Sequence, residues 1–235
     1  MTARKWRFAA IVGLVCCFTG SAYANGGVYL EDIRIKNNGK VVFSDDFNDG
    51  DISDWTHLRD VSVFTIEKTS TQMMLLNEHG NQMAEADHPL DLNLSGSLEF
   101  STMVCIAPPT EQYYGQKDIA CAFNMSLDYR EQPNCAPETL RIHALLYRND
   151  QKCKITVTRL SRDEEKYKSS DMSSAVLPTG KWAILTLRLD SISETATAYV
   201  DDSPVASIKY NANDFPKITS LAFYTTFGDG AQRTD

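Results

Sequence analysis

KWAILTLRLD, residues 181–190, is followed by TATAYVDD, residues 195–202, and then by PVAS, residues 204–207. These stretches are rich in aliphatic, β-branched and aromatic residues, a composition that favours extended backbone over helix. The Asp201-Asp202 pair marks a turn between the second and third stretches, because aspartate side chains hydrogen-bond their own backbone. The region therefore predicts three successive strands joined by short turns.

The rest of the chain continues this pattern. An Asn-Gly turn at Asn38 and Gly39 separates two strand-like runs, which is a strong hairpin signal. No segment shows the 3.6-residue apolar period of a long helix. We therefore predict an all-β fold, a two-sheet antiparallel β-sandwich of the jelly-roll type. Strands are expected at residues 28–35, 40–44, 61–67, 73–76, 83–86, 98–106, 121–129, 140–147, 153–160, 182–189, 195–200, 204–210 and 218–227.

A second stretch, FSDDFNDG at residues 43–50 followed by Trp55, allows a more specific comparison. Together with residues 181–207 it resembles the concanavalin A-like lectin/glucanase superfamily, in its laminin-G-like jelly-roll branch. The resemblance covers most of residues 27–230 and implies one jelly-roll domain over residues 25–235. Since this superfamily contains lectins, carbohydrate-binding modules, adhesion modules, glycoside hydrolases and polysaccharide lyases, it implies no single function.

The two ends of the chain depart from that resemblance. Relatives often end on a strand that pairs beside the segment corresponding to residues 43–50. This chain stops at Asp235, where such a strand would begin, while residues 28–35 carry the same pattern near the other end. Two arrangements stay open: the N-terminal strand fills the seam in permuted order, which we favour, or the terminal strand is lacking.

Residues 1–24 have the three parts of a secretory signal peptide. A positive segment at residues 2–7 precedes an apolar run at residues 8–18, and small residues at 21–24 provide a cleavage site. We expect a secreted or periplasmic protein with no transmembrane segment. The leader carries three basic and no acidic side chains, so its removal lowers the formal net charge from −8 to −11. This acidity argues against nucleic acid as a partner, and leaves neutral glycans, divalent cations and proteins.

Four cysteines remain after the leader is removed: Cys105, Cys121, Cys135 and Cys153. An even number of cysteines in an oxidising compartment favours disulfides over metal binding or catalysis. Cys105 and Cys121 flank one loop between neighbouring predicted strands, so we expect a bridge between them. The pairing of the other two cysteines stays open.

Acidic residues are concentrated in VVFSDDFNDGDISDW, residues 41–55, which holds five aspartates between Asp45 and Asp54. Three interpretations stay open: a structural Ca²⁺ site, a catalytic acid cluster, or turns stabilised by aspartate side chains. The turn interpretation is favoured, followed by calcium, which the resemblance also implies near this seam. The candidate calcium ligands are Asp45, Asp46, Asp49 and Asp32.

The loop at residues 111–116 offers a candidate sugar platform. Tyrosine rings can stack on a pyranose while neighbouring amides bond its hydroxyl groups. The candidate ligand-binding residues are Tyr113, Tyr114, Gln112 and Gln116. The alternative is that one tyrosine only anchors the loop to the sandwich.

Evidence for catalysis is weaker, and no catalytic residue is assigned. Glucanases of the resembled superfamily carry three acids on one strand, whereas Glu85-Ala-Asp87 lacks the third, and Pro89 is expected to interrupt its strand. Arg141-Ile-His143 matches only part of an alginate-lyase pattern. We therefore predict a non-catalytic glycan-binding module, with a glycoside hydrolase or polysaccharide lyase, or a protein-binding adhesion or envelope module, as alternatives.

Overall fold

A computed structural model describes residues 27–66, 71–76, 83–107, 119–131, 137–147, 151–160, 168–174 and 176–227. The predicted signal peptide, residues 1–24, lies outside these ranges. Within them, no helix has the length and apolar character needed to cross a membrane. A short 3-10 helix, η2 (Ala212–Asp214), interrupts a structure otherwise built of strands and turns.

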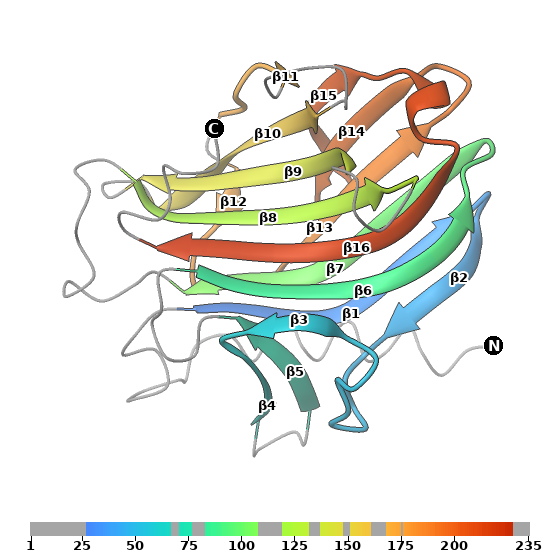
Figure 1. Ribbon diagram of the computed structural model, residues 1–235. Helices are drawn as coiled ribbons and strands as arrows, with labels where there is room; N and C mark the ends of the chain where they lie inside the picture. Colours follow the sequence, from blue (N-terminus) through green and yellow to red (C-terminus); the bar gives the residue numbers. More distant parts are fainter. Residues whose placement is uncertain are drawn as a thin grey trace, which may run out of the picture.

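The described strands form two antiparallel sheets of eight strands each (Figure 1). The first, called sheet A, has the order β15-β14-β13-β7-β1-β5-β4, with β2 paired to β1. Its strands are β1 (Gly27–Asn37), β2 (Lys40–Asp45), β4 (Val61–Ile66), β5 (Thr71–Leu76), β7 (Ser97–Ala107), β13 (Ala183–Asp190), β14 (Thr195–Val200) and β15 (Ser203–Lys209).

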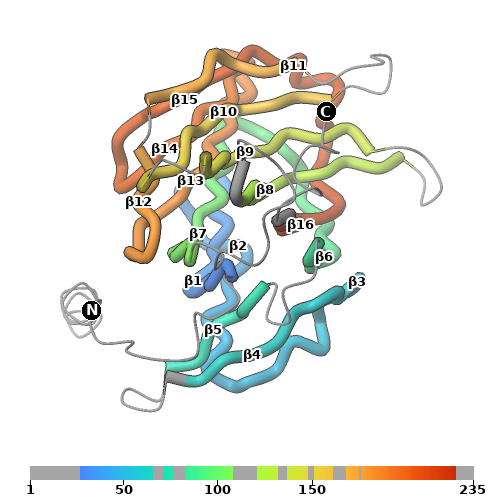
Figure 2. Tube along the Cα trace, turned by 90° about the vertical axis from the view of Figure 1, so that its left-hand side faces the viewer, coloured from blue at the N-terminus to red at the C-terminus, as the bar shows by residue number. Residues whose placement is uncertain are grey.

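The second, called sheet B, has the order β11-β10-β9-β8-β16-β6-β3, with β12 paired to β10. Its strands are β3 (Thr56–Arg59), β6 (Met83–Asn93), β8 (Ile119–Tyr129), β9 (Glu138–Tyr147), β10 (Lys152–Leu160), β11 (Lys168–Ser169), β12 (Leu177–Pro178) and β16 (Lys217–Phe227). From the side, the two sheets are seen as two layers (Figure 2). The predicted all-β, two-sheet antiparallel sandwich is confirmed.

Strand β1 occupies the interior of sheet A. It pairs with β7 along one side, and with β5 and then β2 along the other. The turn into β2 places Asn38 at φ 50° and Gly39 at φ 79°. Two successive left-handed residues are the signature of a type I′ hairpin turn, which Asn-Gly favours. The hairpin predicted from this dipeptide is confirmed.

Alternate residues of both sheets meet in one apolar core. Phe223 on β16 lies near its centre, with ring centroids 5.7 Å from Phe100 of sheet A and 6.1 Å from Phe123 of sheet B. Trp55, from the aspartate-rich segment, stacks on the same ring at 5.9 Å and is 3% exposed. Trp55 is thus a core residue, and it anchors the segment that precedes β3.

The predicted disulfide between Cys105 and Cys121 is wrong. Both thiols, and that of Cys153, are free and buried. Their strands β7 and β8 are consecutive in sequence but belong to different sheets, and Cys105 packs in a separate apolar cluster with Tyr29. Cys121 and Cys153 both face the core, but β9 lies between their strands, a separation of roughly 10 Å that no disulfide can bridge. Cys135 lies outside the described residues.

Strand β6 also differs from expectation, because it continues through Pro89 to Asn93. Its pairing with β16 is shifted between Ile218 and Ser220, opposite the proline, which is the mark of a β-bulge. On its other side, β3 is paired only as far as Asp87. The missing N–H of Pro89 therefore interrupts no regular ladder, and the strand survives.

Candidate functional site

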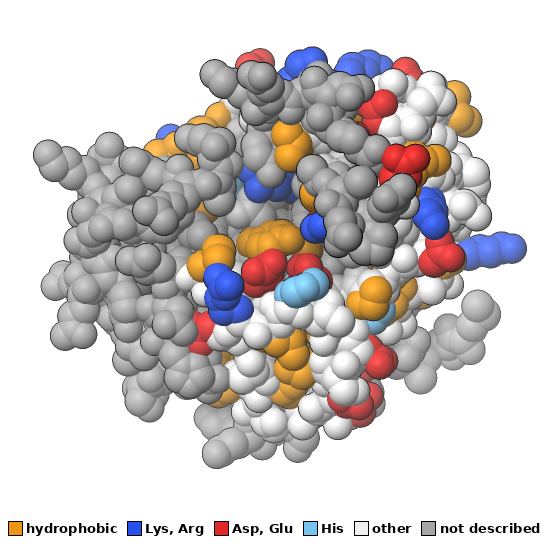
Figure 3. Space-filling view, in the orientation of Figure 1, with side chains coloured by type: hydrophobic (Ala, Val, Ile, Leu, Met, Phe, Trp, Pro, Cys, Tyr) orange, Lys and Arg blue, Asp and Glu red, His pale blue; other side chains and the backbone are white. Residues whose placement is uncertain are grey.

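The outer face of sheet B carries a concentration of polar side chains. On β6, Glu85 and Asp87 alternate with Ala84 and Ala86, which point into the core. The alternation of a β-strand therefore places both carboxyl groups on the outer face. Seen from this side, acidic side chains gather beside a histidine near the middle of the molecule (Figure 3).

Strand register extends this face across the sheet. Residues directly opposite one another on five neighbouring strands, β6, β16, β8, β9 and β10, form a line that we call the polar row. Cross-strand partners share one face of a sheet, with Cβ atoms roughly 5 Å apart. The polar row consists of Glu85, Tyr224, Asn124, His143 and Thr156.

The centre of the polar row contains polar atoms that are buried without partners. Asn124 is 0% exposed, yet neither its amide nitrogen nor its carbonyl oxygen has a hydrogen-bond partner among the residues that the structure describes. Nε2 of the adjacent His143 is likewise buried and unpaired. Buried polar atoms are normally hydrogen-bonded, and leaving one unpaired costs about 1–3 kcal/mol. The arrangement therefore indicates a place where an external polar molecule supplies the missing partners.

A second line of residues lies beside the polar row. Asp87 on β6 is aligned, through Ala222 and Ser126, with Arg141 on β9. Asp87 contacts the Nδ1 atom of His57 through Oδ2 at 3.1 Å. The Tyr224 side chain also favours the charged form of this carboxyl group. Arg141 donates from Nε to Thr158 Oγ1 at 2.9 Å, which holds the guanidinium against the sheet.

Burial sets the protonation of the acids on this face. It raises the pKa of Glu85, with a further rise from Asp87, and it raises the pKa of Asp87 although the nearby His57 favours the charged form. Asp128, farther along β8, is also buried, and its Oδ1 makes no hydrogen bond to a described residue. Burial raises the pKa of Asp128 to about 7. The face therefore disfavours negative charge.

The His143 imidazole and the Tyr224 phenol also shift towards their neutral forms. Burial, and then the charge of Arg141, lowers the pKa of His143 to about 4, so this imidazole is neutral at pH 7. Burial and the neighbouring acids raise the pKa of the Tyr224 phenol. A neutral ligand rich in hydrogen-bonding groups fits this environment better than an ion does.

The aspartate-rich segment serves a different purpose, because its carboxylates bond the chain itself. Asp45 accepts from the Phe47 backbone N–H and from Trp55 Nε1, both at 2.9 Å. Asp46, Asp49 and Asp51 each accept from the N–H two residues ahead, at 3.2, 3.0 and 2.8 Å. These contacts match the turn interpretation of the sequence.

The four candidate calcium ligands bond other groups of the chain. Asp32 lies on β1, where it pairs with Arg34. In the described ranges, no group of three or more acidic, histidine or cysteine residues is arranged to hold a metal ion. The donor set of Asp32, Asp45, Asp46 and Asp49 does not fit a calcium cradle as it stands, and calcium binding stays a prediction of the sequence.

The tyrosine loop, with Gln112, Tyr113, Tyr114 and Gln116, lies outside the described residues. Sequence reasoning singled out Glu85-Ala-Asp87 and Arg141-Ile-His143, but it did not join them or find Asn124 and Tyr224. The Glu85–Asp87 pair, Asn124, the Arg141–His143 pair and Tyr224 lie on four different strands, β6, β8, β9 and β16. Only the strand register brings them together, and no local motif carries that information.

Comparisons with known proteins identify the fold. No protein-family model matches the chain, and no curated protein matches it. A glycoside hydrolase family 16 endo-glucanase from Bacteroides ovatus, in complex with G4G3G-2F-DNP, is 14% identical with a TM-score of 0.53, over 83% of this chain and 90% of that one. Basic winged bean lectin with Tn-antigen is 10% identical with a TM-score of 0.47, over 86% and 89%.

A third solved structure, an apo Crh5 transglycosylase, is 12% identical with a TM-score of 0.43, over 75% of this chain. This chain spans only 65% of that protein's length. At such identities a structural likeness indicates shared architecture and nothing more. The fold is a concanavalin A-like jelly roll, as the resemblance in the sequence implied.

Proposed function

We propose that this protein binds a neutral glycan on the outer face of sheet B, across β6, β16, β8 and β9. The observation that carries the proposal is a pair of adjacent buried side chains, Asn124 and His143. Both polar atoms of the Asn124 side chain, and Nε2 of His143, lack partners in the described part of the chain. A sugar hydroxyl both donates and accepts hydrogen bonds. It can therefore accept from the Asn124 amide nitrogen and donate to the Asn124 oxygen or to Nε2 of neutral His143.

The rest of the polar row suits the same ligand. Tyr224 adjoins Asn124 on β16, and an aromatic ring beside amides can pack against the apolar face of a pyranose. The pKa values of Glu85, Asp87 and Asp128 are raised, so these carboxyl groups are closer to neutral than ordinary acids. A neutral carboxyl group repels an anionic ligand less than an ionised one does, and it does not attract one. Solved structures of similar fold include a glucanase complex and a lectin complex, which supports a carbohydrate-related role.

Glycan hydrolysis is the second candidate, and the acid cluster favours it. General acids need a pKa near the working pH, which is where Asp128 lies, and Glu85 and Asp87 provide further carboxyl groups on the same face. Against this, position 90 on β6 is Leu90, where the glucanase pattern of the resembled superfamily has its third acid. We therefore place binding before catalysis, and secretion remains part of the proposal.

Affinity electrophoresis through gels of neutral and anionic polysaccharides tests the proposal, with residues 25–235 as the protein. We expect retardation in at least one neutral polysaccharide, with no clearing of the gel. The variant Asn124→Ala is expected to lose that retardation, whereas Asn213→Ala, an exposed asparagine on η2, keeps it. Clearing of the polysaccharide would favour hydrolysis, and the absence of retardation in every gel would contradict glycan binding.

A further inference from the structure

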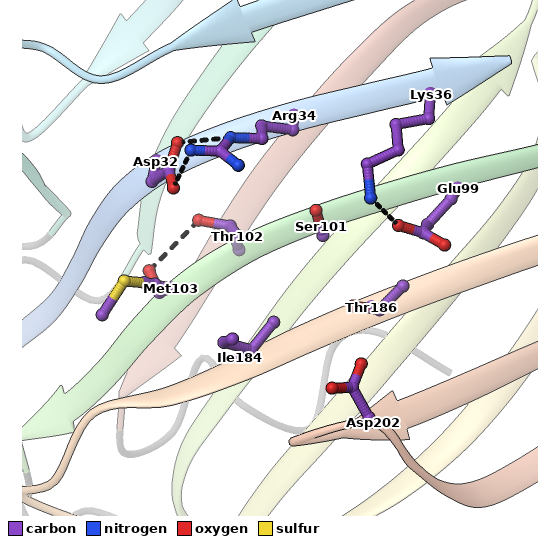
Figure 4. Close-up of a pocket in the computed structure, with 10 residues that line it drawn as sticks. All are labelled: Asp32, Arg34, Lys36, Glu99, Ser101, Thr102, Met103, Ile184, Thr186 and Asp202. Carbon is purple, nitrogen blue, oxygen red and sulfur yellow. Dashed lines mark hydrogen bonds and ion pairs between the residues drawn. The ribbon is translucent and has the colours of Figure 1, made fainter. Parts of the chain in front are cut away.

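The opposite side of the sandwich has a hollow on the outer face of sheet A. It has a volume of about 150 Å³ and crosses β1, β7 and β13 (Figure 4). Ile33 and Ile35 of β1 point into the core, so Arg34 and Lys36 project on this outer side. The hollow is therefore separated from the polar row by the whole thickness of the sandwich, and it is a distinct site.

Short side chains form the floor of this hollow. Arg34 on β1, Ser101 on β7 and Thr186 on β13 lie opposite one another in register. Ser101 and Thr186 are much shorter than the charged residues of the neighbouring register row, Lys36, Glu99 and Arg188, which leaves the depression between them. Within the described part of the chain, neither the Ser101 nor the Thr186 hydroxyl makes a side-chain hydrogen bond, so both are available to a ligand.

Charged pairs form two of its walls. Arg34 donates from Nε to Asp32 Oδ1 at 2.7 Å. Glu99 bridges Lys36 at 2.6 Å and Arg188 at 3.0 Å. Arg188 is held further by the Tyr199 ring, whose centroid lies 4.6 Å away. Each pair presents donors and acceptors side by side in fixed positions, which is the pattern that two adjacent sugar hydroxyls match.

Two acidic residues shape the ends of the site. Asp32 sits at a β-bulge with φ 53°, between the paired residues Glu31 and Arg34. A bulge of this kind re-aims a side chain, and here it directs the carboxylate of Asp32 towards Arg34. At the β14–β15 turn, the Asp202 carboxylate also lines the hollow and has no partner among the described residues. It is a free acceptor for a ligand donor.

From this arrangement we infer a second carbohydrate site: the hollow binds one neutral sugar ring through Ser101, Thr186, Asp202 and the Asp32–Arg34 and Lys36–Glu99 pairs. The apolar side chains of Met103 and Ile184 provide a surface for the ring's C–H groups. Three acidic and two basic residues line the hollow, and Arg188 beside Glu99 supplies a third positive charge, so the wall has no net charge to attract an ion. With sites on opposite faces, one molecule can bridge two glycan chains.

Methyl NMR tests this inference directly, because Met103 lines the hollow. The protein is labelled with ¹³C-methyl methionine, and the Met103 signal is assigned with Met103→Leu. The probes are glucose, galactose, mannose and xylose, with glucuronate and glucosamine as charged comparisons, each up to about 100 mM because one ring binds weakly. We expect a saturable shift of the Met103 signal with at least one neutral sugar.

Two variants separate this site from the polar row. Ser101→Phe fills the floor and is expected to abolish the Met103 shift, while Asn124→Ala on the opposite face leaves it unchanged. Asp202→Asn, which keeps the turn because asparagine tolerates its φ of 65°, is expected to weaken binding at least threefold. No shift with any neutral sugar, a shift that survives both hollow variants, or a shift lost in Asn124→Ala would overturn the inference.

Discussion

At the scale of a single residue, Asn124 carries the proposed binding function. Its side chain lies at the centre of a sheet face and is fully buried, and neither of its polar atoms has a hydrogen-bond partner in the described ranges. Such a residue lowers stability compared with an apolar one of similar size, because its desolvation is not compensated. A residue that costs stability in the free protein is well explained by an interaction made only with a ligand.

This reasoning predicts opposite effects of one substitution on stability and binding. Asn124→Leu removes the unpaired polar atoms and keeps the space filled, so it is expected to stabilise the protein by about 1 kcal/mol, or about 2–4 °C in Tm. The same variant is expected to lose retardation in the polysaccharide gel. Thermal unfolding followed by circular dichroism measures the first effect, and a lower Tm for Asn124→Leu would argue that the amide has a structural role.

Asp128 predicts a pH dependence of stability. Because burial raises its pKa to about 7 from 3.8, the folded protein keeps a proton that the unfolded chain releases. The stabilising effect of this proton is complete below about pH 4 and is lost as pH rises through 7. Asp128→Asn, which needs no proton, is therefore expected to gain about 1–3 kcal/mol relative to wild type between pH 5 and pH 8.

The measurement is Tm for wild type and variant at both pH values. Asp171→Asn serves as the control for removing one negative charge, since Asp171 is exposed. Parallel pH profiles for wild type and Asp128→Asn would show that Asp128 is ionised in the folded protein at neutral pH. That result would also weaken the second candidate function, because a general acid must hold its proton near the working pH.

At the scale of elements, hydrogen bonds of the Asn38 side chain link the β1–β2 hairpin turn to the turn between β6 and β7. Asn38 donates from its side chain to the Ser95 carbonyl at 2.7 Å and accepts from the Ser97 N–H at 3.0 Å. Gly96 lies directly against this side chain: an added Cβ would be 2.3 Å from Asn38 Oδ1. The asparagine of the hairpin turn thus also holds the next turn in place.

Two glycine substitutions test this connection, since Gly39 and Gly96 share a φ of 79°. Gly39→Ala meets no atom within 4 Å and is expected to cost about 1–2 kcal/mol, the strain of a left-handed residue alone. Gly96→Ala carries the same strain and also displaces the Asn38 side chain. It is therefore expected to lower the free energy of unfolding by about 1 kcal/mol or more beyond the loss in Gly39→Ala. Urea unfolding compares the two variants, and equal losses would mean that the Asn38 contacts contribute little.

The sequence predicted elements far better than it predicted the site. Strands and the Asn-Gly hairpin follow from local composition and turn chemistry, so they were recognised. Alternation on one strand also placed Glu85 and Asp87 on one face. In contrast, the position of Asn124 beside His143 in the polar row depends on the register of β8 against β9, which is a property of the whole sheet. The same dependence explains the wrong Cys105–Cys121 bridge, because assignment of β7 and β8 to different sheets is not encoded locally.

For the whole molecule, the cysteines predict the outcome of a thiol titration. Cys105, Cys121 and Cys153 are free and buried, and burial raises the pKa of Cys105 and Cys153 to about 12. Native protein is therefore expected to protect these thiols from Ellman's reagent at pH 8. Unfolding in guanidinium without reductant is expected to expose at least three thiols per chain. Fewer than three would mean that a disulfide forms among them.

Calcium binding is a second property of the whole molecule, and a single measurement tests it. Most of the acids of residues 41–55, and Asp32, are engaged with the chain itself, but a bound ion would favour the folded state by mass action. The calcium prediction requires a higher Tm in calcium than in chelator. Identical melting curves would leave turn formation as the sufficient explanation of the aspartates.

The central claim is that the outer face of sheet B binds glycan through Asn124 and His143. Isothermal titration of wild type, Asn124→Ala and Asn213→Ala with an oligosaccharide of the polysaccharide that retards the protein tests it most directly. We predict that Asn124→Ala raises Kd at least about tenfold, a loss of about 1.4 kcal/mol that is typical of a hydrogen bond to a buried group, while Asn213→Ala leaves Kd unchanged. A wild-type Kd for Asn124→Ala would contradict the claim.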